Sequence, residues 1–499
     1  MMQYILNNIL TAIIFIPILV GCLILFFAKY NTLVKNLALT ASLLSFILSI
    51  ILYIQFDAST ASMQFEILIP WIPLLNINYH LGIDGISMPL LVLNNFITVL
   101  VIIASYKNIK EKINLYNSMF LIMTGLISGA FCALDAVLFY VFFEAMLIPM
   151  YLIIGIWGAS NRVYAAIKFF LYTLLGSLLM LVALIYLYFM SNHSFEILGY
   201  YKTGLTLSVQ IILFIAFFFS FAVKVPMWPL HTWLPDAHPE APTGGSMVLA
   251  AVTLKLGAYG FLRFMLPIVP DAARYLSGLM IVLSLIAVVY IGLIAVVQKD
   301  MKKLVAYSSI SHMGFVTLGC FLFTSNGLNA WGLNGAIIQM ISHGFISAAM
   351  FMCIGILYER IHSRNIADYQ GVATSMPIFA AFFMLFAMAN SGLPGTSGFV
   401  GEFMVIMATL QSKFIYGFFA SLTLIIGAGY TLWMYKRTMF GEIINIKLKN
   451  LPDLDICEFI VLATLSIAVL LVGVYPDILA VKMHASVQNL ITQVLQSKI

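Results

Sequence analysis

Charged residues are scarce in this sequence: only 9% of its 499 residues are Asp, Glu, Lys or Arg, whereas 63% are hydrophobic. A water-soluble fold of this length could not cover so many apolar side chains with polar surface. The mean hydropathy of +1.05 agrees with this conclusion. The composition therefore excludes a soluble globular protein and predicts an integral membrane protein.

Cysteine is also scarce, and no two cysteines have the spacing of a metal or disulfide motif. The sequence contains five, each standing alone in or beside an apolar segment: Cys22, Cys132, Cys320, Cys353 and Cys457. Iron–sulfur clusters, structural zinc and disulfide frameworks need paired or clustered ligands, so the spacing argues against all three. We expect these thiols to pack as small apolar side chains inside helices.

Apolar runs, in contrast, are long and recur along the whole chain. A helix needs roughly 20 residues to cross a hydrocarbon core of ~30 Å. The runs lack the alternation of barrel strands, so an all-α polytopic membrane protein is the predicted fold class. We predict about fourteen transmembrane helices, at 7–28, 34–55, 87–105, 117–133, 135–156, 164–190, 208–230, 244–266, 276–297, 303–323, 331–357, 376–411, 415–435 and 457–478. The first is expected to be a retained span, because it is too long for a signal sequence and lacks a basic start.

The basic residues support this count. Sixteen of the twenty-four Lys and Arg fall in alternate loops on one predicted side and six on the other. Such an asymmetry places the richer side in the cytoplasm or matrix, and an even number of spans then puts both termini on the outer side. The net charge of +5 is modest and spread over loops, so nucleic-acid binding has no support.

Six ionisable residues lie inside predicted spans, four of them charged at neutral pH. A charge at the centre of a membrane helix costs on the order of 3 kcal/mol unless it is paired or hydrated. Depth in the membrane can be counted along a helix at about 1.5 Å per residue. By this count Lys255 and Glu144 both lie about 15 Å from the membrane surface. The six residues are Glu144, Lys224, Lys255, His312, His343 and Glu402.

Such a row at one depth predicts a path for protons or cations, because chains of intramembrane ionisable residues are how pumps and transporters move them. Two simpler interpretations stay open. Each lysine and glutamate could form a salt bridge that only locks helices together. Each histidine could be a core residue whose nitrogens are satisfied by neighbours.

Two spans are interrupted by helix-breaking residues next to these charges. Pro226 and Pro229 follow Lys224 and remove backbone donors, and the long span 376–411 contains "NSGLPGTSG" before Glu402. Interrupted spans at corresponding places in two halves point to a transport site in an inverted repeat. We therefore expect two inverted five-helix repeats, although each break could also be plain packing accommodation.

The expected domain organisation follows from this repeat. It comprises N-terminal transmembrane helices at 1–105, a first five-helix repeat at 117–266, a second inverted repeat at 276–435, and a C-terminal helix and tail at 457–499. An odd number of spans in each repeat forces the two copies into opposite orientations in the membrane.

The loop "WPLHTWLPDAHPEAPTGG" after the first break carries several polar residues: His231, Asp236, His238 and Glu240. These residue types could bind a metal, but the loop has no His pair at i, i+4, and three prolines lie within residues 228–240, which argues against a metal site. We expect the loop to line the mouth of a proton path instead.

At this loop the sequence resembles a known family. The segments "KVPMWPLHTWLPDAHPEAPTGGSMVLAAVTLKLGAYGFLR", "KKLVAYSSISHMGF", "IQMISHGFISAAMF" and "NSGLPGTSGFVGEF" closely resemble the antiporter-like membrane subunits of respiratory NADH:quinone oxidoreductase (complex I), of the subunit M and mitochondrial subunit 4 type. The resemblance covers nearly the whole chain.

The resemblance implies roles for the six residues. It implies that Glu144 pairs with Lys224 on the broken helix, that Lys255 bridges to a hydrophilic axis through His312 and His343, and that Glu402 releases the proton outward. An acid at the second broken helix matches the M-type pattern rather than the N- or L-type. The implied function is proton translocation coupled to NADH oxidation and quinone reduction in partner subunits.

The resemblance also implies what surrounds the chain. The chain itself is expected to hold no cofactor or metal and no redox active site, with FMN, iron–sulfur clusters and quinone in partner subunits. N-type and L-type antiporter-like subunits would be its neighbours in the lipid bilayer. A bacterial inner (plasma) membrane is the expected location, and a mitochondrial inner membrane is the other.

Two other functions remain open at this point. The chain could be a subunit of a multisubunit Na+/H+ antiporter unconnected to NADH oxidation, since that class resembles the same family in fold. It could also be a structural membrane scaffold in which the buried charges only hold helices together. Co-purifying flavin or the genomic neighbours would separate the antiporter from the NADH-linked function, and normal pumping after the six residues are neutralised would support the scaffold.

Overall fold

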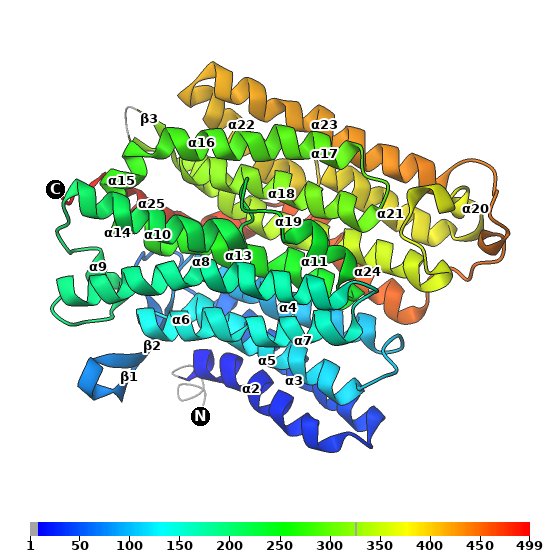
Figure 1. Ribbon diagram of the computed structural model, residues 1–499, viewed down its shortest axis with the longest axis horizontal. Coiled ribbons are helices and arrows are strands. Elements are labelled where there is room, and N and C mark those ends of the chain that lie inside the picture. Colours follow the sequence, from blue (N-terminus) through cyan, green and yellow to red (C-terminus); the bar gives the residue numbers. More distant parts are fainter. Residues whose placement is uncertain (1–7, 325–326) are drawn as a thin grey trace.

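The computed structural model describes residues 8–324 and 327–499. These residues are mostly helical, and most of the helices run side by side along the long axis of the molecule (Figure 1). This is the arrangement that long apolar segments require, because a helix satisfies all of its own backbone hydrogen bonds within a hydrocarbon layer. The predicted all-α membrane fold is confirmed.

The first half of the chain, up to the end of the eighth predicted span, contains a β-hairpin and several long helices. Its elements are α2 (Ile9–Ile24), α3 (Asn31–Gln55), β1 (Gln64–Ile72), β2 (Ile77–Ile83), α4 (Ser87–Ser105), α5 (Ile113–Cys132), α6 (Ala136–Ala145), α7 (Leu147–Trp157), α8 (Arg162–Met190), α9 (Ile197–Tyr200), α10 (Leu207–Lys224), α11 (Leu234–Glu240), α12 (Thr243–Val248), α13 (Leu254–Gly260) and α14 (Leu266–Ile268).

The second half of the chain begins at α15 and again contains several long helices. Its elements are α15 (Pro270–Tyr275), α16 (Ser277–Ile286), α17 (Gly292–Val296), α18 (Met301–Cys320), β3 (Phe323–Thr324), β4 (Gly327–Leu328), α19 (Ala330–Ile361), α20 (Val372–Ser375), α21 (Pro377–Asn390), α22 (Ser397–Ser412), α23 (Phe414–Met439), α24 (Ile456–Val474) and α25 (Asp477–Leu495).

Twelve helices in the described residues are long and apolar enough to cross a membrane, and each coincides with a predicted span. The remaining two predicted spans are also helical. The tenth is α18, a helix of 20 residues that is not among those twelve. The twelfth is divided into the shorter helices α21 and α22, as the "NSGLPGTSG" break predicts.

Breaks in the helices lie beside the predicted charges. Helix α10 ends at Lys224 itself, and α21 and α22 flank the loop before Glu402. A further break, which the sequence analysis did not predict, divides the fifth span after Ala145, one residue beyond Glu144. Pro149 accounts for it, because it has no N–H to donate to the Ala145 carbonyl four residues earlier.

Three π-helical turns interrupt the eighth and ninth predicted spans, at Leu249–Thr253, Phe261–Met265 and Ala287–Ile291. A π-turn inserts a residue into the helix and changes which side chains face a given neighbour, and such turns are frequent at functional sites. The first of them ends two residues before Lys255.

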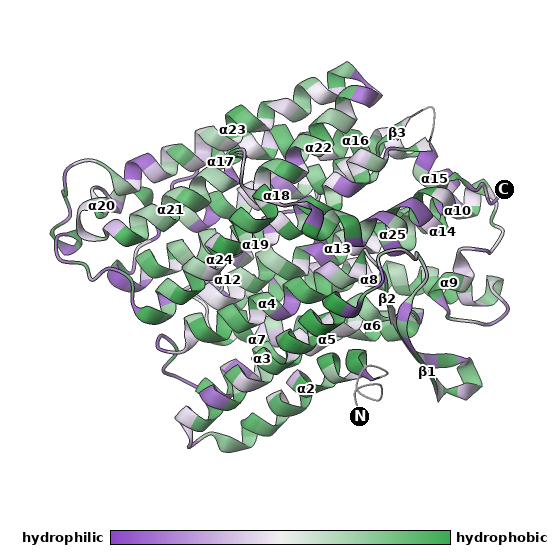
Figure 2. Cartoon of the chain, turned by 180° about the vertical axis from the view of Figure 1, so that it is seen from behind, coloured by the Kyte–Doolittle hydropathy of each residue, from purple (hydrophilic) through white to green (hydrophobic). Residues whose placement is uncertain are grey.

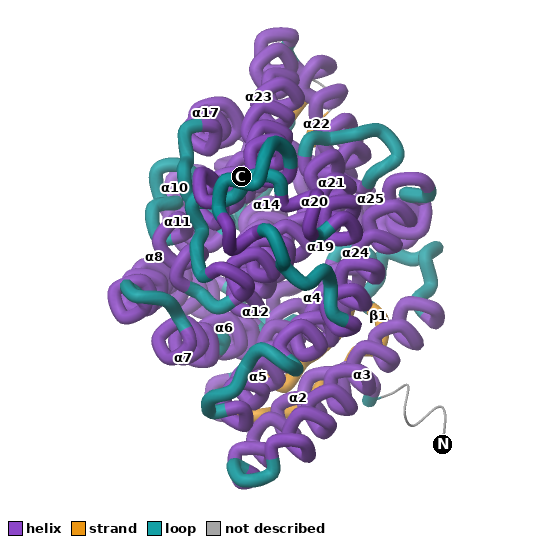
Figure 3. Tube along the Cα trace, turned by 90° about the vertical axis from the view of Figure 1, so that its right-hand side faces the viewer, coloured by secondary structure: helices purple, strands orange, loops and turns teal. Residues whose placement is uncertain are grey.

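The burial of the helices follows their position in the bundle. The hydrophobic windows of Thr243–Ile268 and Ala330–Ile361 are 100% and 94% buried within the chain, whereas those of α2, α3 and α8 are 39% buried. In the end view of Figure 3, α12 and α19 lie inside the cross-section, and α2, α3 and α23 lie at its ends. Hydrophobic residues are spread over the outer helices as well (Figure 2), as expected where lipid replaces water.

Among the elements outside the predicted spans, the β1–β2 hairpin and the C-terminal helix α25 were not predicted. Strands β1 and β2 form an antiparallel hairpin, which projects at the left of Figure 1 near α9. The residues after the last span, expected to be a tail, form α25, a helix of 19 residues. It packs against α19 and the short helices α14 and α15, so its apolar face is used within the chain.

Candidate functional site

Lys255 lies at the centre of the molecule, fully buried on α13. Its Nζ donates to the carbonyl oxygen of Ala250 at 2.5 Å and lies 2.7 Å from Nδ1 of His343 on α19. Ala250 belongs to the π-helical turn Leu249–Thr253. The widened turn presents this carbonyl to an ammonium group five residues later, so the irregular backbone stabilises a cation where the membrane offers no water.

A second histidine, on the neighbouring helix α18, lies beside His343. The rings of His343 and His312 lie 5.7 Å apart, centroid to centroid. His312 Nδ1 in turn lies 2.6 Å from Oε1 of Glu402, which belongs to α22. Lys255, His343, His312 and Glu402 therefore form a continuous row, which we call the central row.

Polar side chains hold the Glu402 end of the central row. Gln339 donates from Nε2 to Oε1 of Glu402 at 3.1 Å, and the Tyr430 hydroxyl lies 3.3 Å from Nε2 of His312. Tyr430 also accepts a hydrogen bond from Ser308 at 3.1 Å. These contacts fix the orientation of the imidazole ring and of the carboxylate, and none of the three supporting residues was singled out from the sequence.

All four members of the central row are at most 4% exposed. They come from four elements, α13, α19, α18 and α22, which contact one another in the middle of the bundle. The Lys255–His343 and His312–Glu402 steps are at hydrogen-bond distance, over which a proton can move directly, whereas the two histidines are related by a ring-to-ring distance of 5.7 Å. Each of the four groups can both accept and release a proton. The row therefore offers a path for a proton through the low-dielectric interior.

Lys224 and Glu144 lie apart from the central row. Lys224 is 3% exposed, and its Nζ donates to the carbonyl oxygen of Phe143 at 2.9 Å. Within residues 8–324 and 327–499, no ion pair joins Lys224 to Glu144. The pairing that the family resemblance implied is thus open in this conformation, although the two groups are electrostatic neighbours.

Glu144 has an unusual environment for a carboxylate. It is half-buried, and among the described residues neither of its oxygens has a hydrogen-bond partner within 3.5 Å. Ser177 and Lys224 are its polar neighbours. An unpaired carboxylate at this depth is costly, so Glu144 is poised to take a proton or to attract the Lys224 ammonium.

His238 is the functional candidate that the sequence analysis placed least accurately. It was expected at a loop mouth, but the structure buries it fully on the short helix α11. Its ring stacks on Phe351 at 4.5 Å, and neither ring nitrogen has a hydrogen-bond partner among the described residues. Burial, with repulsion from the Lys302 and Lys255 ammonium groups, lowers the pKa of His238 to about 3, so its ring is neutral.

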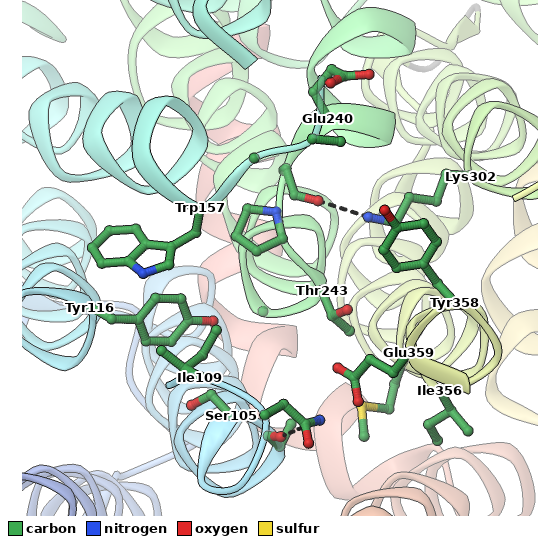
Figure 4. Close-up of a pocket in the computed structure, with 18 of the residues that line it drawn as sticks. Ser105, Ile109, Tyr116, Trp157, Glu240, Thr243, Lys302, Ile356, Tyr358 and Glu359 are labelled. Carbon is green, nitrogen blue, oxygen red and sulfur yellow. Dashed lines mark hydrogen bonds between the residues drawn. The ribbon is translucent and has the colours of Figure 1, made fainter. Parts of the chain in front are cut away.

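A cavity of about 530 Å³ lies next to this histidine, between the ends of α4, α7 and α19 and the start of α12. We call it the inner cavity. Its lining includes Glu240, Lys302, Tyr358 and Glu359, and Figure 4 shows the Lys302 ammonium and the Glu359 carboxylate facing the space between the helices. Lys302 Nζ donates to the carbonyl oxygen of Ala241 at 2.7 Å, and both residues line the cavity.

The other polar residues of the loop have separate partners. Asp236 pairs with Lys168 at 2.6 Å. Glu240 accepts a hydrogen bond from the Asn161 backbone at 2.8 Å and lies 3.5 Å from Arg364. Across the described ranges no group of three or more His, Cys, Asp or Glu side chains converges as metal ligands do. The loop thus links helices at the cavity rim.

One buried ion pair was missed from the sequence. Arg263 lies in the π-helical turn Phe261–Met265, and its Nη2 is 2.7 Å from Oδ1 of Asp84. Tyr259 accepts a hydrogen bond from Nε of Arg263 at 3.1 Å. Only the tertiary structure brings Asp84 of the β2–α4 connection to this helix.

The comparisons with known proteins decide the family. Residues 133–426 match the family described as NADH:quinone oxidoreductase/Mrp antiporter, TM, and residues 9–133 match NADH-ubiquinone oxidoreductase chain 4, amino terminus. NADH-quinone oxidoreductase subunit M of Rhodobacter capsulatus is 46% identical over 97% of this chain and 96% of its own length. The chain belongs to this family. The predicted resemblance is confirmed, and with it the expected class, a membrane subunit of NADH:quinone oxidoreductase.

The chain is also similar to an organelle-type chain 4 protein and to chains of solved structures. NADH-ubiquinone oxidoreductase chain 4 of Marchantia polymorpha is 42% identical over 97% of both chains. A chain of respiratory complex I from Thermus thermophilus with bound NADH superposes with a TM-score of 0.89 at 29% identity, covering 97% of this chain and 99% of that one.

A chain of the Mrp complex from a Dietzia species superposes with a TM-score of 0.82 at 19% identity, covering 96% of this chain and 52% of that one. That likeness shows a shared fold. The much higher identity to subunit M proteins favours the NADH:quinone oxidoreductase function over the antiporter alternative.

Proposed function

We propose that this chain translocates protons as the M-type membrane subunit of NADH:quinone oxidoreductase, with Glu144, Lys224, Lys255, His312, His343 and Glu402 carrying the proton. The central row is the observation that supports this proposal most strongly. It joins a lysine, two histidines and a glutamate in the buried interior through contacts of 2.7 and 2.6 Å and one ring-to-ring step of 5.7 Å. A scaffold has no need of four titratable groups in series.

The open Lys224–Glu144 pair suggests how transfer is controlled. With its charge partner absent, the Lys224 ammonium is held by a neutral carbonyl, whereas pairing with Glu144 would hold the proton by Coulomb attraction. We propose that opening of this pair lets Lys224 pass its proton toward Lys255. Glu402, at the far end of the row, then passes a proton outward.

The inner cavity supplies the entry in this proposal. It opens among the predicted inner loops, and its lining includes Pro239, the residue after His238. The His238 ring is neutral, and its two nitrogens are free of hydrogen bonds within the described residues. Loss of the Lys255 proton would remove one of the two positive charges that oppose its protonation. His238 therefore would connect the cavity to the central row.

The proposed surroundings follow from the family. FMN, iron–sulfur clusters and quinone belong to partner subunits in this proposal, and the chain's neighbours in the membrane are N-type and L-type antiporter-like subunits. Bacterial and organelle-type relatives support a bacterial inner membrane, with the mitochondrial inner membrane as the other location.

We also propose the two inverted repeats as its functional halves. In the block 117–266 the fourth span is broken between α10 and α11, and in the block 276–435 the fourth span is broken between α21 and α22. Each break adjoins a carrier, Lys224 or Glu402. Residues 1–105 and 457–499 are then added helices outside the repeats.

The test is NADH-driven proton uptake by inverted membrane vesicles that carry the Lys224→Ala variant, with assembly of the complex checked in parallel. We expect coupled uptake to be lost while the complex still assembles, because the alanine cannot carry a proton. Glu144→Ala should give the same result. The matched control is Lys449→Ala, an exposed lysine in a loop, which should pump normally.

Full pumping by an assembled Lys224→Ala complex would overturn the proposal and return the lysine to a structural role. Uptake that depends on added Na+ rather than on NADH would instead favour the antiporter function.

A further inference from the structure

We propose that Phe143 is a positioning residue for Lys224: its ring and its carbonyl group form a second, uncharged seat for the ammonium, in competition with Glu144. This inference rests on the proposed function of Lys224 as a proton carrier. It adds the group that holds the lysine when its pair with Glu144 is open.

The geometry of the seat comes from a single residue. The Lys224 Nζ lies 3.4 Å from the centroid of the Phe143 ring and 2.9 Å from the Phe143 carbonyl oxygen. The face of an aromatic ring attracts a cation, most strongly where water is excluded. Both contacts act on the same ammonium, so they favour one position for it.

The position of Phe143 in its helix strengthens the seat. Phe143 lies in the last turn of α6, which ends at Ala145. Carbonyl groups in the last turn of a helix are available to donors outside the helix, and this end of the helix carries the negative part of its dipole. The break caused by Pro149 therefore creates a site for a cation next to Glu144.

The Phe143 ring itself is held firmly. It is fully buried and packs against Phe139, with ring centroids 5.2 Å apart, and against Phe221 at 6.2 Å. Its ring thus keeps its place when the lysine moves. Since neighbouring residues of a helix point in different directions, the ammonium cannot occupy the Phe143 seat and form a close pair with Glu144 at the same time.

The consequence is a balance between two positions of one ammonium. In the Phe143 seat the lysine is charged but has no charged partner, and in the Glu144 position it is locked by the carboxylate. Phe143 thereby sets how often the lysine is free to pass its proton, and Glu144 remains ready to capture it again.

The experiment replaces Phe143 in the assembled complex by 4-fluoro-, 3,5-difluoro- and 3,4,5-trifluorophenylalanine. Fluorine withdraws charge from the ring face and weakens its attraction for a cation, while the volume of the side chain hardly changes. Cryo-electron microscopy of each form locates the Lys224 ammonium, and vesicles report pumping turnover. The control is the same series at Phe217, a buried ring of the same aromatic cluster over which no cation lies in the described parts of the chain.

We expect the ammonium to move from the Phe143 ring to ion-pair distance of Glu144 in the trifluoro form, and pumping turnover to fall in steps with fluorine number, by roughly tenfold overall. An ammonium that stays on the trifluorinated ring would overturn the proposal, as would an equal effect of the Phe217 series. Because the lysine position is measured separately from pumping, a failure of the seat is distinguishable from a failure of proton transfer.

Discussion

At the scale of single residues, several buried polar side chains in this protein each have specific hydrogen-bond or ion-pair partners. Asp84 illustrates this. Its carboxylate binds Arg263 at 2.7 Å and accepts hydrogen bonds from the backbone N–H groups of Ile86 and Ser87 at 3.1 and 2.9 Å. Taking two charges out of water is expensive, and the charge attraction together with these further hydrogen bonds to Oδ1 offsets that cost.

We expect Asp84→Asn to destabilise the protein by about 3–5 kcal/mol, because it leaves the Arg263 guanidinium buried without a counter-charge. The measurement is thermal unfolding of the detergent-solubilised complex together with the amount of assembled complex in membranes. The double variant Asp84→Leu, Arg263→Met removes both charges and should recover much of the loss. A single variant as stable as the wild type would show that the pair contributes nothing.

The same pair has a defined pH dependence. Burial alone would raise the pKa of Asp84, but the Arg263 charge and the hydrogen bonds lower it, and the net direction is below its usual value. A lowered pKa in the folded state means that the stabilising contribution is complete above the unfolded value of about 3.9 and is lost as pH falls through the folded value. The pair therefore keeps its full strength at neutral pH.

At the scale of elements, the functional helices approach one another through glycine. A Cβ placed on Gly401 of α22 would lie 2.7 Å from the backbone nitrogen of Gln339 on α19. This close approach is what allows Gln339 and His312 to reach Glu402, the next residue along α22. The contact between two backbones thus positions a side-chain network.

We expect Gly401→Val to push α22 away from α19 and to cost about 1–3 kcal/mol of stability through overpacking. Proton pumping should fall by at least about tenfold, because a shift of one pKa unit in the transfer path corresponds to about 1.4 kcal/mol, which is a factor of ten. Gly429→Val is the matched control, because nothing lies within 4 Å of a Cβ at Gly429. Proton uptake and thermal stability are measured for both. Normal pumping by the Gly401 variant would show that the spacing of these helices is unimportant.

At the scale of the whole molecule, the distribution of basic residues predicts one orientation in the membrane. The connection after α3, the β1–β2 hairpin and α9 lie toward one end of the bundle, and α20 lies at the other (Figure 1). The loop-rich end with α20 is the basic and therefore inner one. The inner cavity then opens to the side from which a pump takes up protons.

We expect a cysteine at Ser59 to react with a membrane-impermeant maleimide from the outer side, and one at Lys110 to react only after the membrane is opened. Both positions are exposed, and they lie in consecutive loops on opposite sides in the predicted topology. The background is a chain whose five native cysteines are replaced by serine or alanine. Labelling in the reverse order would contradict the predicted orientation.

The sequence by itself determined the fold class, the approximate span boundaries and the six ionisable residues, because apolar length and the cost of buried charge are local properties of a chain in a membrane. It also located the breaks after Lys224 and before Glu402, since proline and glycine act on their own backbone.

The tertiary structure alone decided which of these groups meet. It joined Lys255 to His343 and His312 to Glu402, left Lys224 on Phe143 rather than on Glu144, and placed His238 inside the bundle. These contacts link residues up to about ninety positions apart, on helices whose rotation depends on π-turns and on packing against neighbours. No periodicity in one segment records that rotation, because it is set by the helices on the other side of the contact.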